Sequence, residues 1–368
     1  MTFTKILLEW YRDNARDLPW RKTSDPYLIW ISEVILQQTR IAQGLEYYFR
    51  FIERFPSVGE LAKADEQEVL KTWQGLGYYS RARNMHKAAK EIMEKHNGIF
   101  PAGYEGLLML KGIGEYTAAA VASIAYNHPC PVVDGNVLRF FSRFFGIHTP
   151  IDTLGGKRKV HENMRLLLDK KQPGIFNQAV MEFGALQCTP VAPNCDHCPL
   201  GDSCFAKEKK LISSLPVKEN KTKITHRYFY HFVVFANGML HVNKRTKKDI
   251  WQNLYEFPLY ESLQPMELSD ILQTEWFLSL TRRKTFQVEF QSSEIKHILS
   301  HQTIHAYFYI IRIDELDSIA PPYIRVTEEQ LSHLPVSRLT DKFIKKFSQN
   351  LDSAQNKHNF TQSTLKIN

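Results

Sequence analysis

Long apolar runs are missing from this sequence, since no stretch of its 368 residues approaches the length of a membrane span. Its first residues, MTFTKILLEWYRDNARDLPW, lack the apolar core of a signal peptide. Cysteine is also scarce: there are five, and four of them fall between positions 188 and 204, unlike the spread framework of a disulfide-rich secreted protein. We therefore expect a soluble, intracellular protein with no membrane partner and a cytoplasmic location.

Acidic residues are fewer than basic ones: the sequence has 39 Asp and Glu and 47 Lys and Arg, which gives a net charge of +8. This balance suits a polyanionic partner, although charge alone is weak evidence because many basic proteins bind none. The hydrophobic fraction of 43% is enough to bury sizeable cores, and the length favours two domains.

Strand patterns are absent from the first 205 residues, where helical periodicity dominates, for example over 27–54 and 80–96. Residues 206–226 are polar, basic and almost without periodicity, as in a linker. Period-two runs such as YFYHFVVFANGMLHVNKR follow, with an Asn-Gly hairpin signal, and 265–279 and 327–347 look helical. We predict a helical domain over 1–205, a basic linker over 206–226, a smaller α+β domain over 227–347 and a disordered tail over 348–368.

The segment LKGIGEYTA places Gly112 and Gly114 between two helical patterns, YEGLLML and EYTAAAVASIAY. A helix, a glycine turn and a second helix would leave unpaired N–H groups at a helix start, where they can bind a phosphate. The alternative is an ordinary corner between two helices, which a lone pair of glycines favours.

Two carboxylates lie in apolar surroundings. Asp134, in VVDGNVLR, precedes Gly135 and Asn136 at a predicted helix start and could simply cap that helix. Glu33 lies within the strongly apolar stretch WISEVILQQT, where burial would raise its pKa and make it a candidate general acid. The second carboxylate would stay ionised in a polar niche.

Four cysteines, Cys188, Cys195, Cys198 and Cys204, have the spacing C-x6-C-x2-C-x5-C. Thiolates this close can hold one ion or cluster. A structural zinc would prefer two closely spaced pairs, so the uneven spacing favours one [4Fe–4S] cluster. His197 lies inside the loop but is not needed as a ligand, and Cys130 is interpreted as a small buried thiol.

Together these motifs resemble the helix–hairpin–helix DNA glycosylase superfamily, with similar stretches over most of residues 10–205. Within it the similarity is greatest to the MutY-type enzymes, which remove adenine and carry a Nudix-like C-terminal domain. KKDIWQNLYEFP and ILSHQTIHAYFY are similar to segments of that domain, although Leu299 stands where the family often has Phe. The glutamate-rich Nudix box is lacking, which argues against pyrophosphate hydrolysis.

The resemblance implies a DNA glycosylase of base excision repair, acting at the nucleoid as a monomer on duplex DNA that contains A opposite 8-oxoguanine or G. It implies that Glu33 protonates adenine, that Asp134 stabilises the sugar cation and that Asn136 positions groups beside it. Tyr116 replaces the lysine of the related endonuclease III and cannot form a Schiff base, so a monofunctional enzyme is expected, with Tyr116 hydrogen-bonded beside Asp134. The residues implied in DNA or base binding are Arg21, Gln38, Thr39, Tyr78, Gly112, Gly114, Gln178, Ser300 and His301.

Three alternatives stay open at this point. A bifunctional endonuclease III-like enzyme is opposed by the tyrosine at position 116. A non-catalytic protein that binds damaged DNA is opposed by the presence of Glu33 and Asp134. A nucleotide hydrolase acting through the C-terminal domain is opposed by the missing Nudix box.

Overall fold

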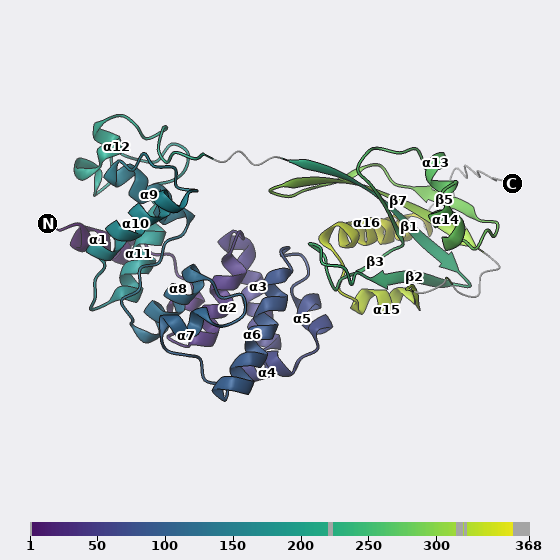
Figure 1. The fold of residues 1–368 in the computed structure, drawn as a ribbon, viewed down its shortest axis with the longest axis horizontal. Coiled ribbons are helices and arrows are strands. Elements are labelled where there is room, and N and C mark those ends of the chain that lie inside the picture. Colours follow the sequence, from purple (N-terminus) through teal and green to yellow (C-terminus); the bar gives the residue numbers. More distant parts are fainter. Residues whose placement is uncertain (1, 220–223, 314–318, 320–321, 356–368) are drawn as a thin grey trace. The chain divides into compact units, whose positions relative to one another are not determined.

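The computed structural model describes residues 2–219, 224–313, 319 and 322–355 (Figure 1). Two compact units are formed. The first comprises Met1–Lys63 and Asn84–Lys221, and the second comprises Ala64–Arg83 and Thr222–Asn368. This division differs from the predicted contiguous boundary because Ala64–Arg83, although early in the chain, belongs with the C-terminal residues.

The first unit is helical. Its elements are α1 (Phe3–Asn14), η1 (Pro19–Arg21), α2 (Pro26–Leu36), α3 (Ile41–Arg54), α4 (Val58–Lys63), most of α6 (Ser80–His96), α7 (Tyr104–Leu108), α8 (Glu115–Tyr126), α9 (Gly135–Phe145), α10 (Leu154–Leu167), α11 (Pro173–Leu186), η2 (Gly201–Ser203) and α12 (Phe205–Glu208). Within the described residues, no helix of either unit is long and apolar enough to cross a membrane.

Close approach of α11 to two other helices shapes the centre of this unit. A Cβ on Gly174 would lie 2.7 Å from the carbonyl oxygen of Ser123 in α8, and one on Gly184 would lie 2.8 Å from that of Asn136 in α9. Aromatic rings fill the space between α9 and α11, with the Phe140 and Phe183 centroids 4.7 Å apart. The glycines therefore allow α8 and α9, which carry candidate catalytic residues, to pack directly on α11.

The second unit contains an eight-stranded mixed sheet with the central order β3-β2-β1-β7-β5. β4 also pairs with β1, β6 with β7 and β8 with β2. The strands are β1 (Thr225–Ala236), β2 (Met239–Lys244), β3 (Tyr255–Glu256), β4 (Leu259–Ser262), β5 (Gln287–Gln291), β6 (Ile295–Ile298), β7 (Gln302–Ile313) and β8 (Ile324–Val326). The predicted hairpin is confirmed, since Asn237 and Gly238 both have positive φ and Ala236 pairs with Met239.

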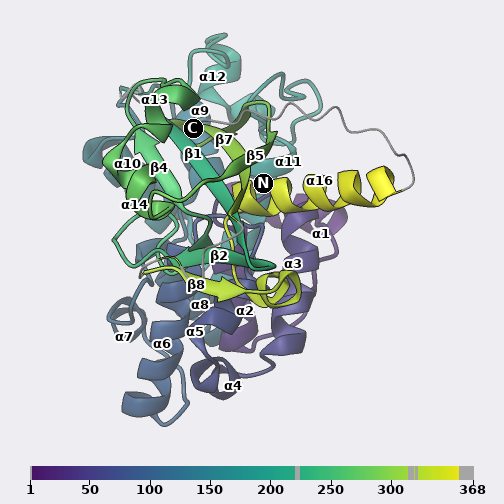
Figure 2. The ribbon, with the colours of Figure 1, turned by 90° about the vertical axis from the view of Figure 1, so that its right-hand side faces the viewer.

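Helices cover both faces of this sheet (Figure 2). They are α13 (Leu268–Leu272), α14 (Glu275–Leu280), α15 (Glu328–His333) and α16 (Arg338–Gln355). The unit also contains α5 (Glu66–Thr72). Phe277 of α14 packs on Phe232 from one side, and Phe343 of α16 stacks on Phe308 from the other, with centroids 4.1 Å apart. Because both faces are covered, the middle of β1 is continuously buried instead of alternating.

Two segments differ from the predicted boundaries. Part of the predicted linker folds onto the first unit, where Ala206 and Leu215 are buried. Helix α16 continues to Gln355 and so enters the segment predicted as a disordered tail. The remainder of that tail, 356–368, lies outside the described residues, as do linker residues 220–223.

Candidate active site

The predicted glycine turn joins α7 to α8. Gly112 has a φ of 78°, and a Cβ there would lie 2.4 Å from the Cβ of Asn84. Glycine is therefore required at this position both for its backbone angle and for its space. Gly114 occupies the N-cap position of α8, and Tyr116 follows in the first turn of that helix.

Glu33 lies on α2 with only 7% of its surface exposed. Its Oε2 accepts a hydrogen bond of 2.5 Å from the Tyr116 hydroxyl. Burial raises the pKa of Glu33 to about 7, which the Tyr116 hydrogen bond opposes and the nearby Asp134 charge reinforces. The predicted buried carboxyl with a raised pKa is confirmed.

Asp134 caps α9: its Oδ1 accepts from the Val137 backbone N–H at 2.7 Å, and its Oδ2 accepts from Asn136 Nδ2 at 2.8 Å. Burial raises the pKa of Asp134, while these hydrogen bonds and the Arg139 charge oppose the rise. Asp134 can therefore both cap α9 and belong to the candidate active site, because its carboxylate also lines a cleft.

Tyr116 was predicted to hydrogen-bond beside Asp134, and the structure shows that its partner is Glu33. The Tyr116 hydroxyl instead contacts Glu33 and, at 3.7 Å, the sulfur of Met181. Both Asp134 oxygens are occupied by groups at the start of α9, whereas the first turn of α8 faces α2. Asp134 acts on Tyr116 through its charge, which adds to the effects of burial and of Glu33 in raising the pKa of the phenol.

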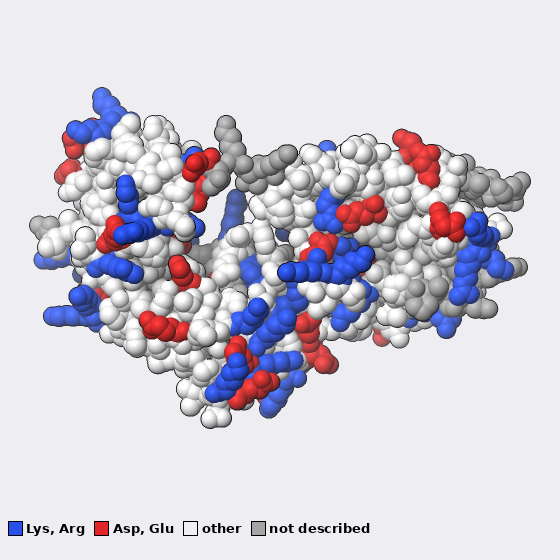
Figure 3. Space-filling view, viewed as in Figure 1, with Lys and Arg blue, Asp and Glu red and all other residues white. Residues whose placement is uncertain are grey.

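A cleft of about 1530 Å³ in the first unit brings several predicted residues together. Its lining includes the candidate catalytic residues Tyr116, Asp134 and Asn136 and the candidate DNA-binding residue Gln38. Lys157, Arg158, Arg165 and Lys170 also line it. Elsewhere, basic and acidic side chains are interspersed over the face shown in Figure 3. The cleft therefore combines carboxylic acids with cations that can meet DNA phosphates.

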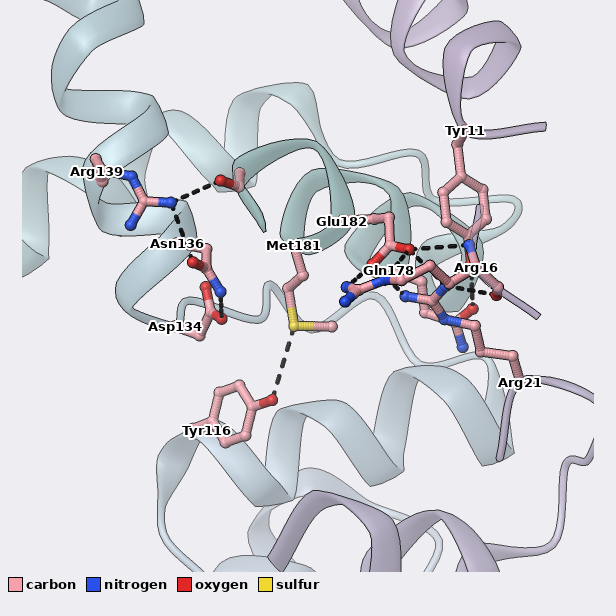
Figure 4. Close-up of polar contacts among 11 residues, drawn as sticks. Tyr11, Arg16, Arg21, Tyr116, Asp134, Asn136, Arg139, Gln178, Met181 and Glu182 are labelled. Carbon is pink, nitrogen blue, oxygen red and sulfur yellow. Dashed lines mark hydrogen bonds and ion pairs between the residues drawn. The ribbon is translucent and has the colours of Figure 1, made fainter. Parts of the chain in front are cut away.

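Arg21 pairs with Glu182 and Gln178 pairs with Tyr11, and the Arg21 guanidinium lies 5.5 Å from the centroid of the Tyr11 ring (Figure 4). Arg21 binds both carboxylate oxygens of Glu182, at 3.0 and 2.7 Å, and Arg16 binds the same carboxylate at 2.8 and 2.5 Å. Burial alone would raise the pKa of Glu182, but the hydrogen bonds from Arg16 and Arg21 bring it to about 2. The Tyr11 hydroxyl donates to Gln178 Oε1 at 2.9 Å.

Sequence reasoning missed Glu182, which has 1% of its side chain exposed. The signal was present, because Glu182 lies in the apolar stretch FNQAVMEFGA, as Glu33 lies in WISEVILQQT. The sequence around Arg16 and Tyr11 did not mark them as site residues, because both lie on an amphipathic N-terminal segment. Their contacts with Glu182 and Gln178 of α11 appear only in the structure.

Arg139, also missed, connects the cysteine segment to Asn136 and Asp134, and Figure 4 shows the Asn136 and Asp134 end of this connection. Its Nε donates to the Cys188 carbonyl oxygen at 2.9 Å, and its Nη2 donates to Asn136 Oδ1 at 3.1 Å. Asn136 in turn donates to Asp134. A chain of hydrogen bonds therefore runs from Cys188 through Arg139 and Asn136 to Asp134.

The four clustered cysteines line a single cavity together with apolar side chains from α9 and α11. The buried Arg143 holds the first part of this loop, donating to the Thr189 and Pro190 carbonyl oxygens at 2.7 and 3.1 Å and to Cys188 Sγ at 3.5 Å. Over the described residues, no group of three or more His, Cys, Asp or Glu side chains is arranged to hold one metal ion.

Gln38 and Thr39 lie in the turn after α2, where Gln38 has a φ of 58°. Tyr78 belongs to the second unit, has a φ of 48° and is 41% exposed. A non-glycine residue in this region costs of the order of 1–3 kcal/mol and persists where the surroundings impose it, which is common at functional sites.

Ser300 and His301 occupy the exposed tip between β6 and β7, with Ser300 Oγ 3.3 Å from His301 Nδ1. Backbone contacts hold this tip, since the His301 carbonyl oxygen accepts from the Thr225 backbone N–H at 3.1 Å. The second unit therefore presents two neighbouring polar side chains on a supported hairpin.

The helical unit with its hairpin and buried carboxyl defines the class of helix–hairpin–helix DNA glycosylases. Residues 31–165 match the HhH-GPD superfamily of base excision DNA repair proteins, and residues 230–346 match the NUDIX domain. A thermostable thymine-DNA glycosylase structure is similar with a TM-score of 0.53 and 28% identity, covering 56% of this chain and 95% of that one. A trapped endonuclease III–DNA covalent intermediate shares the fold, with 23% identity and a TM-score of 0.50 over 56% of this chain and 95% of that one.

The chain belongs to the adenine DNA glycosylase family. It is 34% identical to the adenine DNA glycosylase of Buchnera aphidicola subsp. Schizaphis graminum over 82% of this chain and 85% of that protein. It is 41% identical to the Rattus norvegicus enzyme over 58% of this chain and 44% of that protein. The protein is therefore a DNA N-glycosylase of base excision repair, and the alternative of a non-catalytic DNA-binding protein is set aside.

Proposed function

We propose that this glycosylase hydrolyses the N-glycosidic bond of adenine paired with 8-oxoguanine or guanine in duplex DNA. The observation that carries the proposal is the buried Glu33, whose pKa of about 7 leaves it protonated in a useful fraction at neutral pH. A second carboxylate, Asp134, lines the adjoining cleft. Excision of a purine needs both a proton donor for the base and an anion beside the developing sugar cation.

In the proposed reaction the adenine leaves the base stack and enters the cleft. Glu33 donates its proton to N7 of the base, and the glycosidic electron pair leaves with adenine. Tyr116 orients the carboxyl, since its hydroxyl donates to Oε2 and leaves Oε1 to carry the proton. Asp134 stabilises the oxocarbenium ion, and Asn136 and Arg139 hold that carboxylate in place. Water then adds at C1′ and gives up a proton to the ionised Glu33, which restores the acid.

The product is an abasic site in an intact strand. At the hairpin position of the endonuclease III lysine, Tyr116 offers no amine for a Schiff base. The rival is a bifunctional glycosylase with lyase activity, and borohydride trapping of a covalent enzyme–DNA adduct distinguishes the two.

Recognition is divided between the units. Arg21, which Glu182 orients, and Gln178, which Tyr11 orients, contact the adenine. Gln38, Thr39 and Tyr78 probe the strands at the mispair, and the left-handed backbone at Gln38 and Tyr78 supports this role. Gly112 and Gly114 bring hairpin N–H groups to a phosphate, and Ser300 and His301 read the 8-oxoguanine.

Cys188, Cys195, Cys198 and Cys204 hold one [4Fe–4S] cluster. The donor set fits, because four thiols line one cavity and thiolates are the ligands that hold such clusters. When bound, the cluster supplies a structural cross-link and not an electron for the hydrolysis. Arg139 and Arg143 connect the loop it organises to α9, near Asp134. We place the enzyme in the cytoplasm at the nucleoid, as a monomer.

The test is a single-turnover excision assay on duplexes that bear A opposite 8-oxoguanine, A opposite G, T opposite G and U opposite G. We expect excision from the first two duplexes only. The control is Asp134→Asn, which should lose most excision while still binding the mispaired DNA. Equal excision of T or U opposite G would contradict the proposed substrate.

A further inference from the structure

The loop that carries Tyr78 belongs to the same compact unit as the C-terminal residues. Ala64–Arg83 belongs to the second unit, although the residues on both sides of it along the chain belong to the first. Helix α6, which starts at Ser80, continues across that boundary. A specific set of polar contacts fixes this segment to Val336 and to the start of α16.

Gln74 uses both ends of its carboxamide in these contacts. Its Nε2 donates to Asp341 Oδ1 at 2.9 Å, and its Oε1 accepts from the Val336 backbone N–H at 3.1 Å. The Tyr79 hydroxyl donates to the Val336 carbonyl oxygen at 3.1 Å, with 1% of Tyr79 exposed. Val336 is thus held through both of its backbone polar groups, and Gln74 and Tyr79 bracket the intervening loop.

The loop between Gln74 and Tyr79 has an unusual backbone conformation. Gly75, Gly77 and Tyr78 all have positive φ, at 101°, 76° and 48°. Trp73 Nε1 and Arg81 Nη2 donate to the Gly77 carbonyl oxygen at 3.0 and 3.2 Å. Tyr78 alone of these three has a Cβ that disfavours this backbone angle, yet its ring is 41% exposed. An exposed ring on an unfavourable backbone needs fixed points on either side, and the contacts of Gln74 and Tyr79 supply them.

We infer that Gln74, Tyr79 and Asp341 form a lock that positions Tyr78 for insertion into the DNA, so that the C-terminal unit controls strand probing as well as base reading. This inference rests on the proposed role of Tyr78. Gln74 and Asp341 are positioning residues: they act through the loop and not on the substrate.

The test uses the full-length protein and a duplex with 2-aminopurine beside an A opposite 8-oxoguanine, whose fluorescence rise reports unstacking at the mispair. Gln74→Met removes the amide contacts with Asp341 and Val336, together with a weaker one of 3.5 Å to Lys71 Nζ, and we expect unstacking to slow about tenfold. Asp341→Leu should slow it in the same direction, whereas Asp341→Asn keeps an acceptor and should restore the rate. Lys345→Met is the matched control, since it removes the other partner of Asp341, at 2.9 Å, and leaves Gln74 in place.

A double-mutant cycle with Tyr78→Ala separates positioning from general destabilisation. If the lock acts through Tyr78, the double variant Gln74→Met/Tyr78→Ala unstacks no more slowly than Tyr78→Ala alone. Additive effects, or a normal rate for Gln74→Met beside a slow Tyr78→Ala, would overturn the lock and leave the role of Tyr78 standing. A normal rate for Tyr78→Ala would overturn the probing role itself, and the lock with it.

Discussion

The Tyr116 hydroxyl donates a hydrogen bond of 2.5 Å to Oε2 of the buried Glu33. The two residues come from α8 and α2. Tyr116 supplies the polar contact that a buried carboxyl needs, and Glu33 accepts the hydrogen bond of a half-buried phenol. The contact also adjusts the acidity of Glu33, because it favours the ionised form against the larger effect of burial. Glu33 therefore titrates near neutrality instead of at higher pH.

Glu33→Gln should lower the single-turnover excision rate constant by at least about a hundredfold, because a general acid is lost. The same change should stabilise the fold at high pH. The pKa of Glu33 is about 7 in the folded protein against 4.5 ordinarily, so its stabilising contribution is complete below 4.5 and is lost as the pH rises through 7. Removing the buried charge should raise the free energy of unfolding at pH 8 by up to about 3 kcal/mol. Excision retained by a folded Glu33→Gln protein would contradict the assignment.

The pH profile offers a separate test of the Tyr116–Glu33 contact. With protonated Glu33 as the acid, the excision rate constant should fall about tenfold per pH unit above pH 7. Tyr116→Phe removes the interaction that lowers the pKa of Glu33, so the decline should begin at higher pH. Single-turnover rates across the pH range measure both curves. An unshifted profile for Tyr116→Phe would show that the hydrogen bond does not tune the acid.

Glu182→Ala should destabilise the first unit by about 3–5 kcal/mol, because Arg16 and Arg21 lose a buried partner. Glu162→Ala is the control: its exposed pair with Arg158 should contribute less than about 1 kcal/mol. Since the pKa of Glu182 is lowered to about 2, its contribution is present above 4.5 and is lost as the pH falls towards 2. Urea unfolding at pH 7 and pH 3 should show the difference between variant and wild type narrowing at the lower pH.

Arg143→Met should loosen the cysteine loop, since it removes the donors to Cys188, Thr189 and Pro190. We expect lower iron content and weaker absorbance at about 400 nm in the purified variant. Arg158→Met, on the exposed surface, is the control and should keep both signals. Zinc in place of iron in the wild-type protein would contradict the proposed cluster.

Ser300→Ala and His301→Ala should reduce the preference for A opposite 8-oxoguanine over A opposite G more than they reduce excision of A opposite G. Each side chain lies on an exposed tip, so the fold should be unaffected, and Ser279→Ala provides an exposed control. Point variants are more informative than deletion of the C-terminal unit, because that unit also holds the Tyr78 loop. An unchanged ratio of the two rate constants would refute the division between the units.

Several features of the fold and of the candidate site could be predicted from short segments of the sequence. The spacing of apolar residues distinguished the helical part of the chain from the part that forms the sheet. The Asn237-Gly238 pair predicted a hairpin, which the structure confirms. Glu33 was predicted to be buried because a carboxylate within an apolar helix is unusual, and the same reasoning applied to FNQAVMEFGA would have found Glu182. Local pattern could not supply Arg139 or Arg16, whose sequence surroundings resemble those of surface cations.

The sequence by itself determined the class of chemistry, since the glycine turn, the two carboxylates and the cysteine spacing are properties of short segments. Only the tertiary structure decided which groups meet. Tyr116 bonds Glu33 and not Asp134, because the oxygens of Asp134 are taken up in capping α9. Residues 64–83 join the C-terminal unit through partners more than 250 positions away. Such contacts depend on how the helices pack against one another, and the spacing of residues along the chain does not predict that packing.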